Sequence, residues 1–190
     1  LYKKLEKEVD HSAGLRLNGA LSIAQNKGRW QELQRQATTA QLYDVDVKIL
    51  DKNQIKKDYP IINTDEVIGG ILMPGDGAAD PSGVTHMLAK GAKMEGAQIF
   101  EKSPVEEILT KDGKISGVKV NGQTINCEYI VLASGMWSRQ IGERIGVSVP
   151  LYPAEHFYII TEPIENLSKT LPVIRDFDNS TYIKEDAGKI

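Results

Sequence analysis

The sequence predicts a mixed α/β (α+β) fold that combines part of a doubly wound dinucleotide-binding domain with a β-rich second layer. The first observation is a run of elements in which a helix, a β-hairpin and a buried strand lead into an Ala-Ser-Gly turn and a further helix. The second is that β-rich stretches flank this run on both sides. We therefore expect residues 80–150 to form the dinucleotide-binding part. Residues 13–79 and 151–190 would form a substrate-binding layer, and residues 1–12 a helical lead-in.

Strand and helix signals alternate in the first part of the chain. Residues 15–24 alternate between apolar and polar side chains, which is typical of a half-buried strand. Residues 28–44 carry apolar side chains at helical spacing, and residues 45–50 indicate a short strand. Asp51 has the side chain of an N-cap, and Pro60 ends the helix that follows it.

The most clearly marked helix begins at Asp80-Pro81, where Asp supplies the N-cap and Pro the first helical residue. The apolar residues 67–73 predict a strand that reaches this helix through a loop of turn formers. The run Gly75–Asp80 starts like a GxGxxG phosphate loop, but Asp stands in place of the third glycine, so we interpret it as a turn. Gly96 marks the end of the helix. Its apolar stripe follows helical spacing: Val84, Met87, Leu88, Gly91 and Ala92.

The next region is rich in short strands. Asp112-Gly113 is a hairpin-turn pair between two of them. The expected strands cover residues 98–100, 105–110, 115–120 and 124–126.

An apolar strand and a helix follow the hairpin. Residues 129–133 are apolar throughout, as expected of a strand that is covered on both faces. A helix from Ser138 to about Arg144 follows and ends before Gly146. We expect two more strands, over residues 156–161 and around residues 181–184.

Composition excludes several classes of protein. The 190 residues include 23 basic and 26 acidic side chains, a net charge of −3, so we expect no nucleic-acid partner. One cysteine, Cys127, and three scattered histidines make a disulfide framework or a metal centre unexpected. No apolar run reaches the roughly 20 residues of a membrane helix, and the start lacks a signal-peptide core. We expect the chain to be an internal piece of a longer protein, because it begins without Met and its last residues do not complete a recognisable helix or strand.

The residues alone leave three candidate positions open. Ala133-Ser134-Gly135 follows a buried strand and precedes a helix, where a ligand can approach the backbone, although a plain tight turn explains it equally well. His156 lies beside an expected strand, where a histidine is more often packed or on the surface than catalytic. Tyr182 lies within an expected strand, where an aromatic side chain usually belongs to the core.

A family resemblance adds to this interpretation. Residues 72–83, Leu-Met-Pro-Gly-Asp-Gly-Ala-Ala-Asp-Pro-Ser-Gly, resemble a segment of the dimethylglycine and sarcosine dehydrogenases. These enzymes form a branch of the FAD-dependent amine oxidoreductases in the D-amino-acid oxidase superfamily. Further stretches match in the same order over nearly the whole chain: residues 14–17, 59–64, 133–138 and 172–176.

The resemblance implies an FAD enzyme that oxidises an N-methyl group of a small amino acid. His156 and Tyr182 match family positions near the substrate amine, where a histidine can accept the proton that the amine must lose. Arg175 is a candidate cation for the substrate carboxylate, with a surface salt bridge as its alternative role. Five residues would lie along FAD: Val105, Ala133, Ser134, Gly135 and Trp137.

The resemblance also implies partners and an incomplete cofactor site. The family's GxGxxG motif, its acidic ribose-binding residue and its covalent-FAD histidine would lie upstream of Leu1, so only part of an FAD site is expected here. An electron-transfer flavoprotein or oxygen would accept the electrons, and tetrahydrofolate would bind to the longer parent protein. We expect a cytoplasmic location, or the mitochondrial matrix in a eukaryote. Two alternatives stay open, namely a sarcosine-oxidase-type or other amino-acid oxidase, and a non-catalytic regulatory or protein-binding relative.

Overall fold

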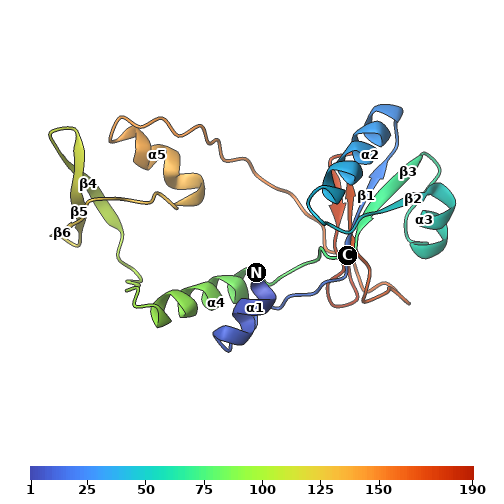
Figure 1. Cartoon of the computed structure of the whole chain (residues 1–190), viewed down its shortest axis with the longest axis horizontal. Coiled ribbons are helices and arrows are strands. Elements are labelled where there is room, and N and C mark those ends of the chain that lie inside the picture. The colour runs from blue at the N-terminus through green and yellow to red at the C-terminus, as the bar shows by residue number, and fades with distance from the viewer. The chain divides into compact units, whose positions relative to one another are not determined.

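The computed structural model describes all 190 residues and divides the chain into two compact units (Figure 1). The sheet unit contains residues 1–97 and 159–190, and the hairpin unit contains residues 98–158. These boundaries differ from the expected ones at residues 80 and 151. Assigning cofactor and substrate roles to the two parts stays a prediction.

A five-stranded mixed sheet forms the centre of the sheet unit. The strands lie in the order β2-β3-β1-β7-β8, with β1 antiparallel to β3 and parallel to β7. Every residue of β1 is buried, as expected of a central strand with neighbours on both sides. The bounds are β1 Ala20–Ala24, β2 Lys48–Asp51, β3 Gly69–Met73, β7 Val173–Asp176 and β8 Thr181–Ile183.

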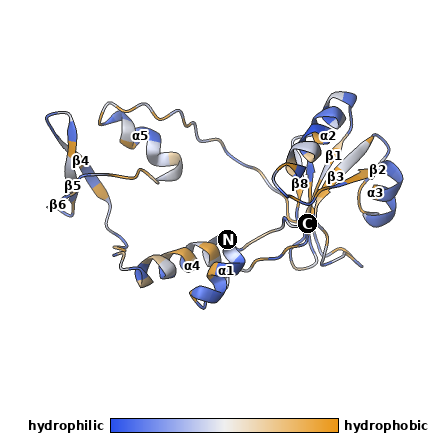
Figure 2. Cartoon of the chain, viewed as in Figure 1, coloured by the Kyte–Doolittle hydropathy of each residue, from blue (hydrophilic) through white to orange (hydrophobic).

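Two helices pack on opposite faces of this sheet. On one face α2 (Lys27–Gln41) packs Leu33 against Ala24 and Ile71. On the other, α3 (Lys52–Asp58) packs Ile55 against Leu21. Figure 2 shows that α3 is mostly hydrophilic. Its buried residue is the apolar Ile55.

The predicted helix caps are confirmed. The Asp51 carboxylate accepts a hydrogen bond from the Gln54 backbone N–H, and the Gln54 side chain accepts one from the Asp51 N–H, forming a capping box. Asp80 caps α4 (Pro81–Met94) by accepting from the N–H groups of Ser82 and Gly83. The buried side of α4 packs against the segment of α1 (Tyr2–Glu8) and the residues after it, through Val9, Ala13 and Met87.

The hairpin unit contains a three-stranded antiparallel sheet. Its strands are β4 (Val105–Lys111), β5 (Lys114–Val120) and β6 (Gln123–Asn126). Asp112 and Gly113 both have positive φ, at 52° and 74°, as the predicted tight hairpin turn requires. A short 3-10 turn, η1 (Gly135–Trp137), then leads into α5 (Ser138–Glu143).

Three expected strands are absent. Residues 129–133 form no strand, and Tyr129 and Val131 are 85% and 88% exposed. Residues 156–161 and 98–100 form no strand either. The physical reason is the same in each case, because a strand needs a hydrogen-bonded neighbour and no strand of this chain pairs with these residues.

Other expected strands differ in extent. The strand expected over residues 15–24 begins only at Ala20, and Arg16 instead forms an isolated bridge with Ala78. The strand expected at residues 45–50 covers Lys48–Asp51. Strand β7 was not expected, because its apolar part is only Val173 and Ile174, too short for a periodic signal.

Candidate functional site

An accessible pair of polar side chains lies on the β7–β8 hairpin. Arg175 of β7 and Tyr182 of β8 are directly opposite each other in the antiparallel register. Opposite residues of paired strands project to the same face of a sheet, so these two side chains share one face. Tyr182 is 62% exposed, and the Arg175 side chain is 39% exposed. Both groups are therefore open to a ligand, and Tyr182 is not the core residue that strand periodicity alone favours.

Arg175 faces a carboxylate from a distant part of the chain. Its Nη2 atom lies 3.6 Å from Oδ2 of Asp76, which belongs to the glycine-rich loop after β3. The backbone of this loop is pinned, since Gly19 N–H donates to the Asp76 carbonyl and Arg16 and Ala78 exchange two hydrogen bonds of 2.7 and 2.9 Å. The loop thus serves as a turn, as the sequence predicted.

The surroundings of Gly77 leave no room for a side chain at this position of the loop. A Cβ atom added to Gly77 would lie 1.9 Å from the Arg16 carbonyl oxygen, well inside van der Waals contact. The close approach of the two backbones therefore requires a residue without a side chain. Backbone packing therefore accounts for the glycine at position 77.

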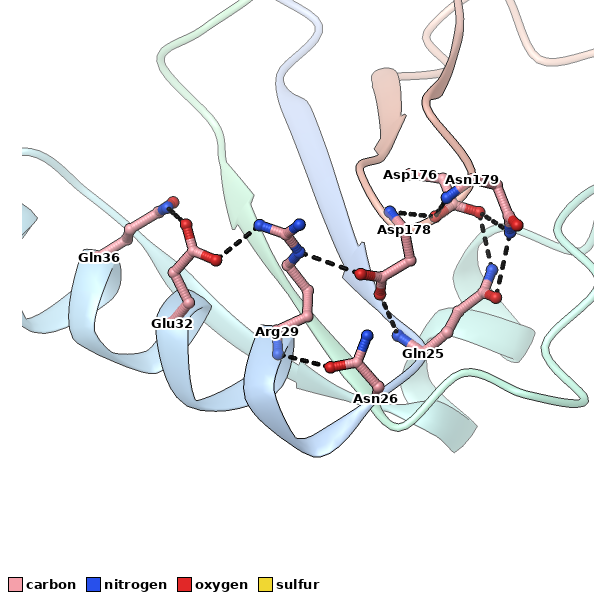
Figure 3. Close-up of polar contacts among 8 residues, drawn as sticks. All are labelled: Gln25, Asn26, Arg29, Glu32, Gln36, Asp176, Asp178 and Asn179. Atoms are coloured by element: carbon pink, nitrogen blue, oxygen red, sulfur yellow. Dashed lines mark hydrogen bonds and ion pairs between the residues drawn. The ribbon is translucent and has the colours of Figure 1, made fainter.

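A polar network fixes the β7–β8 turn to the junction of β1 and α2 (Figure 3). The Gln25 N–H and the Arg29 Nε–H donate to the Asp178 carboxylate, at 3.0 and 3.2 Å. The Asp176 carboxylate accepts from the side chains of Gln25 and Asn179, at 2.7 and 2.8 Å. The contacts of Gln25 and Arg29 with the two carboxylates join residues about 150 positions apart, so no local sequence pattern could have predicted them.

This network lowers the pKa of the Asp178 carboxyl. Burial by itself would raise its pKa, but the hydrogen bonds from Gln25 and Arg29 and the positive charge of Arg29 outweigh burial and lower the pKa. Asp178 is therefore held in its charged form.

An ion pair between Arg16 and the buried Glu185 fixes the chain after β8. Glu185 is only 3% exposed, and its carboxylate accepts from Arg16 Nη1 at 3.2 Å and from the Gly188 N–H at 2.9 Å. Arg16 Nη2 also donates to the Glu185 carbonyl. Because the polar network holds the turn before β8 and this pair holds the chain after it, Tyr182 lies on a strand that is anchored at both ends.

A groove of about 540 Å³ lies elsewhere on the sheet unit. Its walls are partly apolar, with Leu17, Tyr59 and Leu72 among them. Arg16 and Lys169 are the cations on its lining. Burial and the neighbouring Asp58 carboxylate raise the pKa of Tyr59, so its phenol stays protonated. Arg175 and Tyr182 do not line this groove.

The predicted cofactor residues lie in the hairpin unit and are open to a ligand. Val105 is the first residue of β4 and is 49% exposed. Ala133 is exposed and Ser134 half-buried, and Gly135 has no atom within 4 Å of where a Cβ would lie. Trp137, just before α5, is 63% exposed. Open small residues beside an accessible aromatic ring fit contact with a planar cofactor.

His156 lies in the hairpin unit and Tyr182 in the sheet unit. His156 is exposed, and it belongs to a stretch of chain without helix or strand. The structure brings Tyr182 and Arg175 together on one hairpin. The expected cooperation of His156 with Tyr182 stays a prediction.

The family of the chain follows from comparison with known proteins. The family model for FAD-dependent oxidoreductases matches residues 1–190, the full length of the chain. The chain belongs to the FAD-dependent oxidoreductase family. No helix in the structure has the length and apolar character needed to cross a membrane.

Relatives of known activity show a range of functions within this family. The chain is 34% identical over 189 residues to 4-methylaminobutanoate oxidase (formaldehyde-forming) of Paenarthrobacter nicotinovorans, covering 100% of the chain and 23% of that protein. It is 34% identical over 187 residues to human mitochondrial sarcosine dehydrogenase, covering 96% and 20%. It is also 30% identical over 193 residues to the mouse mitochondrial pyruvate dehydrogenase phosphatase regulatory subunit, covering 100% and 22%. The chain thus spans about a fifth of the length of these relatives.

A solved structure agrees with the fold. L-Proline dehydrogenase from P. horikoshii matches with a TM-score of 0.85 and 27% identity, over 99% of this chain and 50% of that chain. The predicted family and mixed α/β class are therefore confirmed.

The tuned Asp178 carboxyl leads to a test of acid stability. Because its pKa is lower in the folded state, its stabilisation is full above the usual value of 3.8 and is lost as the pH falls through the lower folded value. We expect Asp178→Asn to lower the free energy of unfolding by about 1 kcal/mol at pH 7. Below pH 4 the variant should lose less stability with falling pH than the wild type does. Urea unfolding at pH 7 and pH 3 measures both effects. Asp46→Asn, at an exposed position, is the control, and equal pH dependence in all three proteins would contradict the role of Asp178.

Proposed function

We propose that this chain forms part of an FAD-dependent enzyme that oxidises the N-methyl C–N bond of a small amino acid, dimethylglycine or sarcosine, by hydride transfer to the flavin. The observation that carries the proposal is the accessible pair of Tyr182 and Arg175, in register on one anchored hairpin. Membership of the FAD-dependent family and similarity to a sarcosine dehydrogenase support it.

Five residues of the hairpin unit would hold FAD. Trp137 offers an exposed ring, and Gly135 leaves its backbone open. When bound, the flavin supplies the redox chemistry by accepting a hydride. The residues proposed to lie along it are Val105, Ala133, Ser134, Gly135 and Trp137.

The substrate carboxylate would bind to Arg175. Its guanidinium presents several N–H donors in a plane, which matches the two oxygens of a carboxylate. Tyr182 lies directly across the strand pair and would hydrogen-bond near the amine end of the same small molecule. Together the two side chains would fix which C–H bond of the substrate is presented.

His156 would handle the proton of the amine. The nitrogen lone pair must be free to assist C–H cleavage, whereas the amine is protonated at neutral pH. A ring nitrogen of His156 would accept this proton, and the hydride then leaves the carbon of the neutral amine. The resulting iminium ion would be hydrolysed by water to formaldehyde and the demethylated amine, or would pass its one-carbon unit to tetrahydrofolate.

Partners and location follow the same proposal. An electron-transfer flavoprotein or oxygen would reoxidise the flavin. The protein would act in the cytoplasm, or in the mitochondrial matrix of a eukaryote, and several relatives are mitochondrial proteins.

Two other functions have support. A sarcosine-oxidase-type or other amino-acid oxidase would use the same residues with a different acceptor or substrate, and similarity to a 4-methylaminobutanoate oxidase favours this neighbouring chemistry. A non-catalytic regulatory role is supported by the 30% identity to a phosphatase regulatory subunit. His156 and Tyr182 argue for the enzyme, because a regulatory protein has no need of a proton acceptor and a phenol at these two positions.

A flavin titration tests the proposed function directly. We expect FAD absorbance to change on addition of the protein, and the bound flavin to bleach under anaerobic conditions with dimethylglycine or sarcosine. The control amine is ethyldimethylamine, which lacks a carboxylate and should bleach the flavin far more slowly. A perturbed flavin that neither amino acid bleaches would favour the regulatory role.

The proton role of His156 predicts a shifted pH profile. In the flavin-loaded protein, His156→Gln should slow flavin reduction at pH 7 by about 100-fold and move the rise in rate to higher pH, because solution must then deprotonate the amine. Stopped-flow reduction across pH 6 to 10 measures this. His11→Gln is the matched control, and an unchanged profile in His156→Gln would remove the proton role.

Tyr182 is tested by removing its hydroxyl alone. Tyr182→Phe should slow flavin reduction by about tenfold, the loss expected for one well-placed hydrogen bond to the reacting molecule. Tyr43→Phe, at another exposed tyrosine of the sheet unit, should leave the rate unchanged. Equal rates in both variants would make Tyr182 a surface residue without a catalytic role.

A further inference from the structure

Arg175 differs from the other arginines that contact the sheet. Arg16 donates two hydrogen bonds to Glu185, and Arg29 donates to Asp178 and Glu32. The Arg175 side chain makes no hydrogen bond, and its ion-pair contact is with Asp76 at 3.6 Å. All five N–H donors of an arginine are therefore unused in a guanidinium that lies beside an exposed phenol.

Asp76 is, in contrast, a fixed group. Its Oδ1 atom accepts a hydrogen bond from the Gly77 N–H at 2.8 Å, while Oδ2 is the atom that faces Arg175. The backbone on both sides is held by Gly19 and by the Arg16–Ala78 bridge. The Asp76 carboxylate is thus held in place by hydrogen bonds, and it faces the long side chain of Arg175.

We propose that Asp76 is an internal competitor for Arg175, which a substrate carboxylate must displace, and that it thereby sets the affinity and selectivity of the site. This inference rests on the proposed function, because it takes Arg175 as the cation for the substrate. An exposed, single-contact ion pair contributes little, so it is easily exchanged. A carboxylate that makes two parallel hydrogen bonds to the guanidinium is held more strongly. Asp76 therefore favours ligands with a freely oriented carboxylate over weaker anions.

Exchange leaves the loop intact. When Arg175 turns to a ligand, Asp76 keeps its hydrogen bond to Gly77 and stays partly exposed to water, so no buried charge is left unpaired. If Arg16 turned from Glu185 to a ligand in the same way, the buried Glu185 carboxylate would lose its ion-pair partner. Displacing Glu185 from Arg16 is therefore more costly than displacing Asp76 from Arg175, because the Glu185 side chain is buried and the Asp76 side chain is partly exposed.

The test measures carboxylate binding by the 190-residue chain without flavin. Acetate and dimethylglycine are titrated separately while the Nε–H resonance of Arg175 is followed by NMR. We expect Asp76→Asn to bind acetate about two- to fivefold more tightly than the wild type, the range that loss of an exposed ion pair supports. The asparagine retains an oxygen for the Gly77 N–H, so the loop should keep its shape. Arg175→Gln should abolish binding, and Asp46→Asn, with the same change in charge, should bind as the wild type does.

Each outcome decides the inference. Equal or weaker acetate binding by Asp76→Asn, or no binding by either protein, would overturn it and make Asp76 a group that only positions Arg175. If Asp76→Asn does not fold, Asp76→Ser is measured in its place. Tighter acetate binding combined with no bleaching by dimethylglycine in the flavin titration would leave the carboxylate competition standing and reject the proposed substrate. Bleaching without tighter binding would reject the competition alone.

Discussion

The parallel pairing of β1 with β7 is the contact on which the rest of the sheet unit depends. It joins residues 20–23 to residues 173–176, across a gap of some 150 positions that includes the whole hairpin unit. A parallel pair cannot be closed by a tight turn, so its stability has to come from burial of β1 on both faces. The β7–β8 hairpin, and with it Arg175 and Tyr182, is placed only because this pairing forms.

Charged groups add to the apolar contacts that fix the hairpin. Val173 and Ile174 bury the start of β7, and burial of a strand already opposes a one-residue shift of register. The carboxylates of Asp176 and Asp178 accept hydrogen bonds from Gln25 and from main-chain groups that match only one register. Since a mispaired buried charge is costly, these contacts select that register and leave Tyr182 exposed at the edge of the sheet.

Local signals in the sequence predicted local structure well. The caps at Asp51 and Asp80 and the turn at Asp112-Gly113 depend on a few neighbouring residues, and all three are present. The strand predicted over residues 129–133 is absent because it depends on distant residues: an apolar run becomes a strand only where another strand pairs with it. The site shows the same division. The sequence pointed to Arg175 and Tyr182 through a family resemblance, whereas Asp76, the partner of Arg175, could not be found without the fold.

The same division explains why the family alone does not decide the function. An oxidase, a dehydrogenase and a regulatory subunit are each 30–34% identical to this chain over the matched residues. Gly77 must be glycine whether or not a substrate ever binds, since its constraint is the Arg16 carbonyl. Arg175 and Tyr182 carry no such constraint, as both are partly exposed and neither is needed to fill the core. Their chemistry therefore carries more information about function than the segments that make the family recognisable.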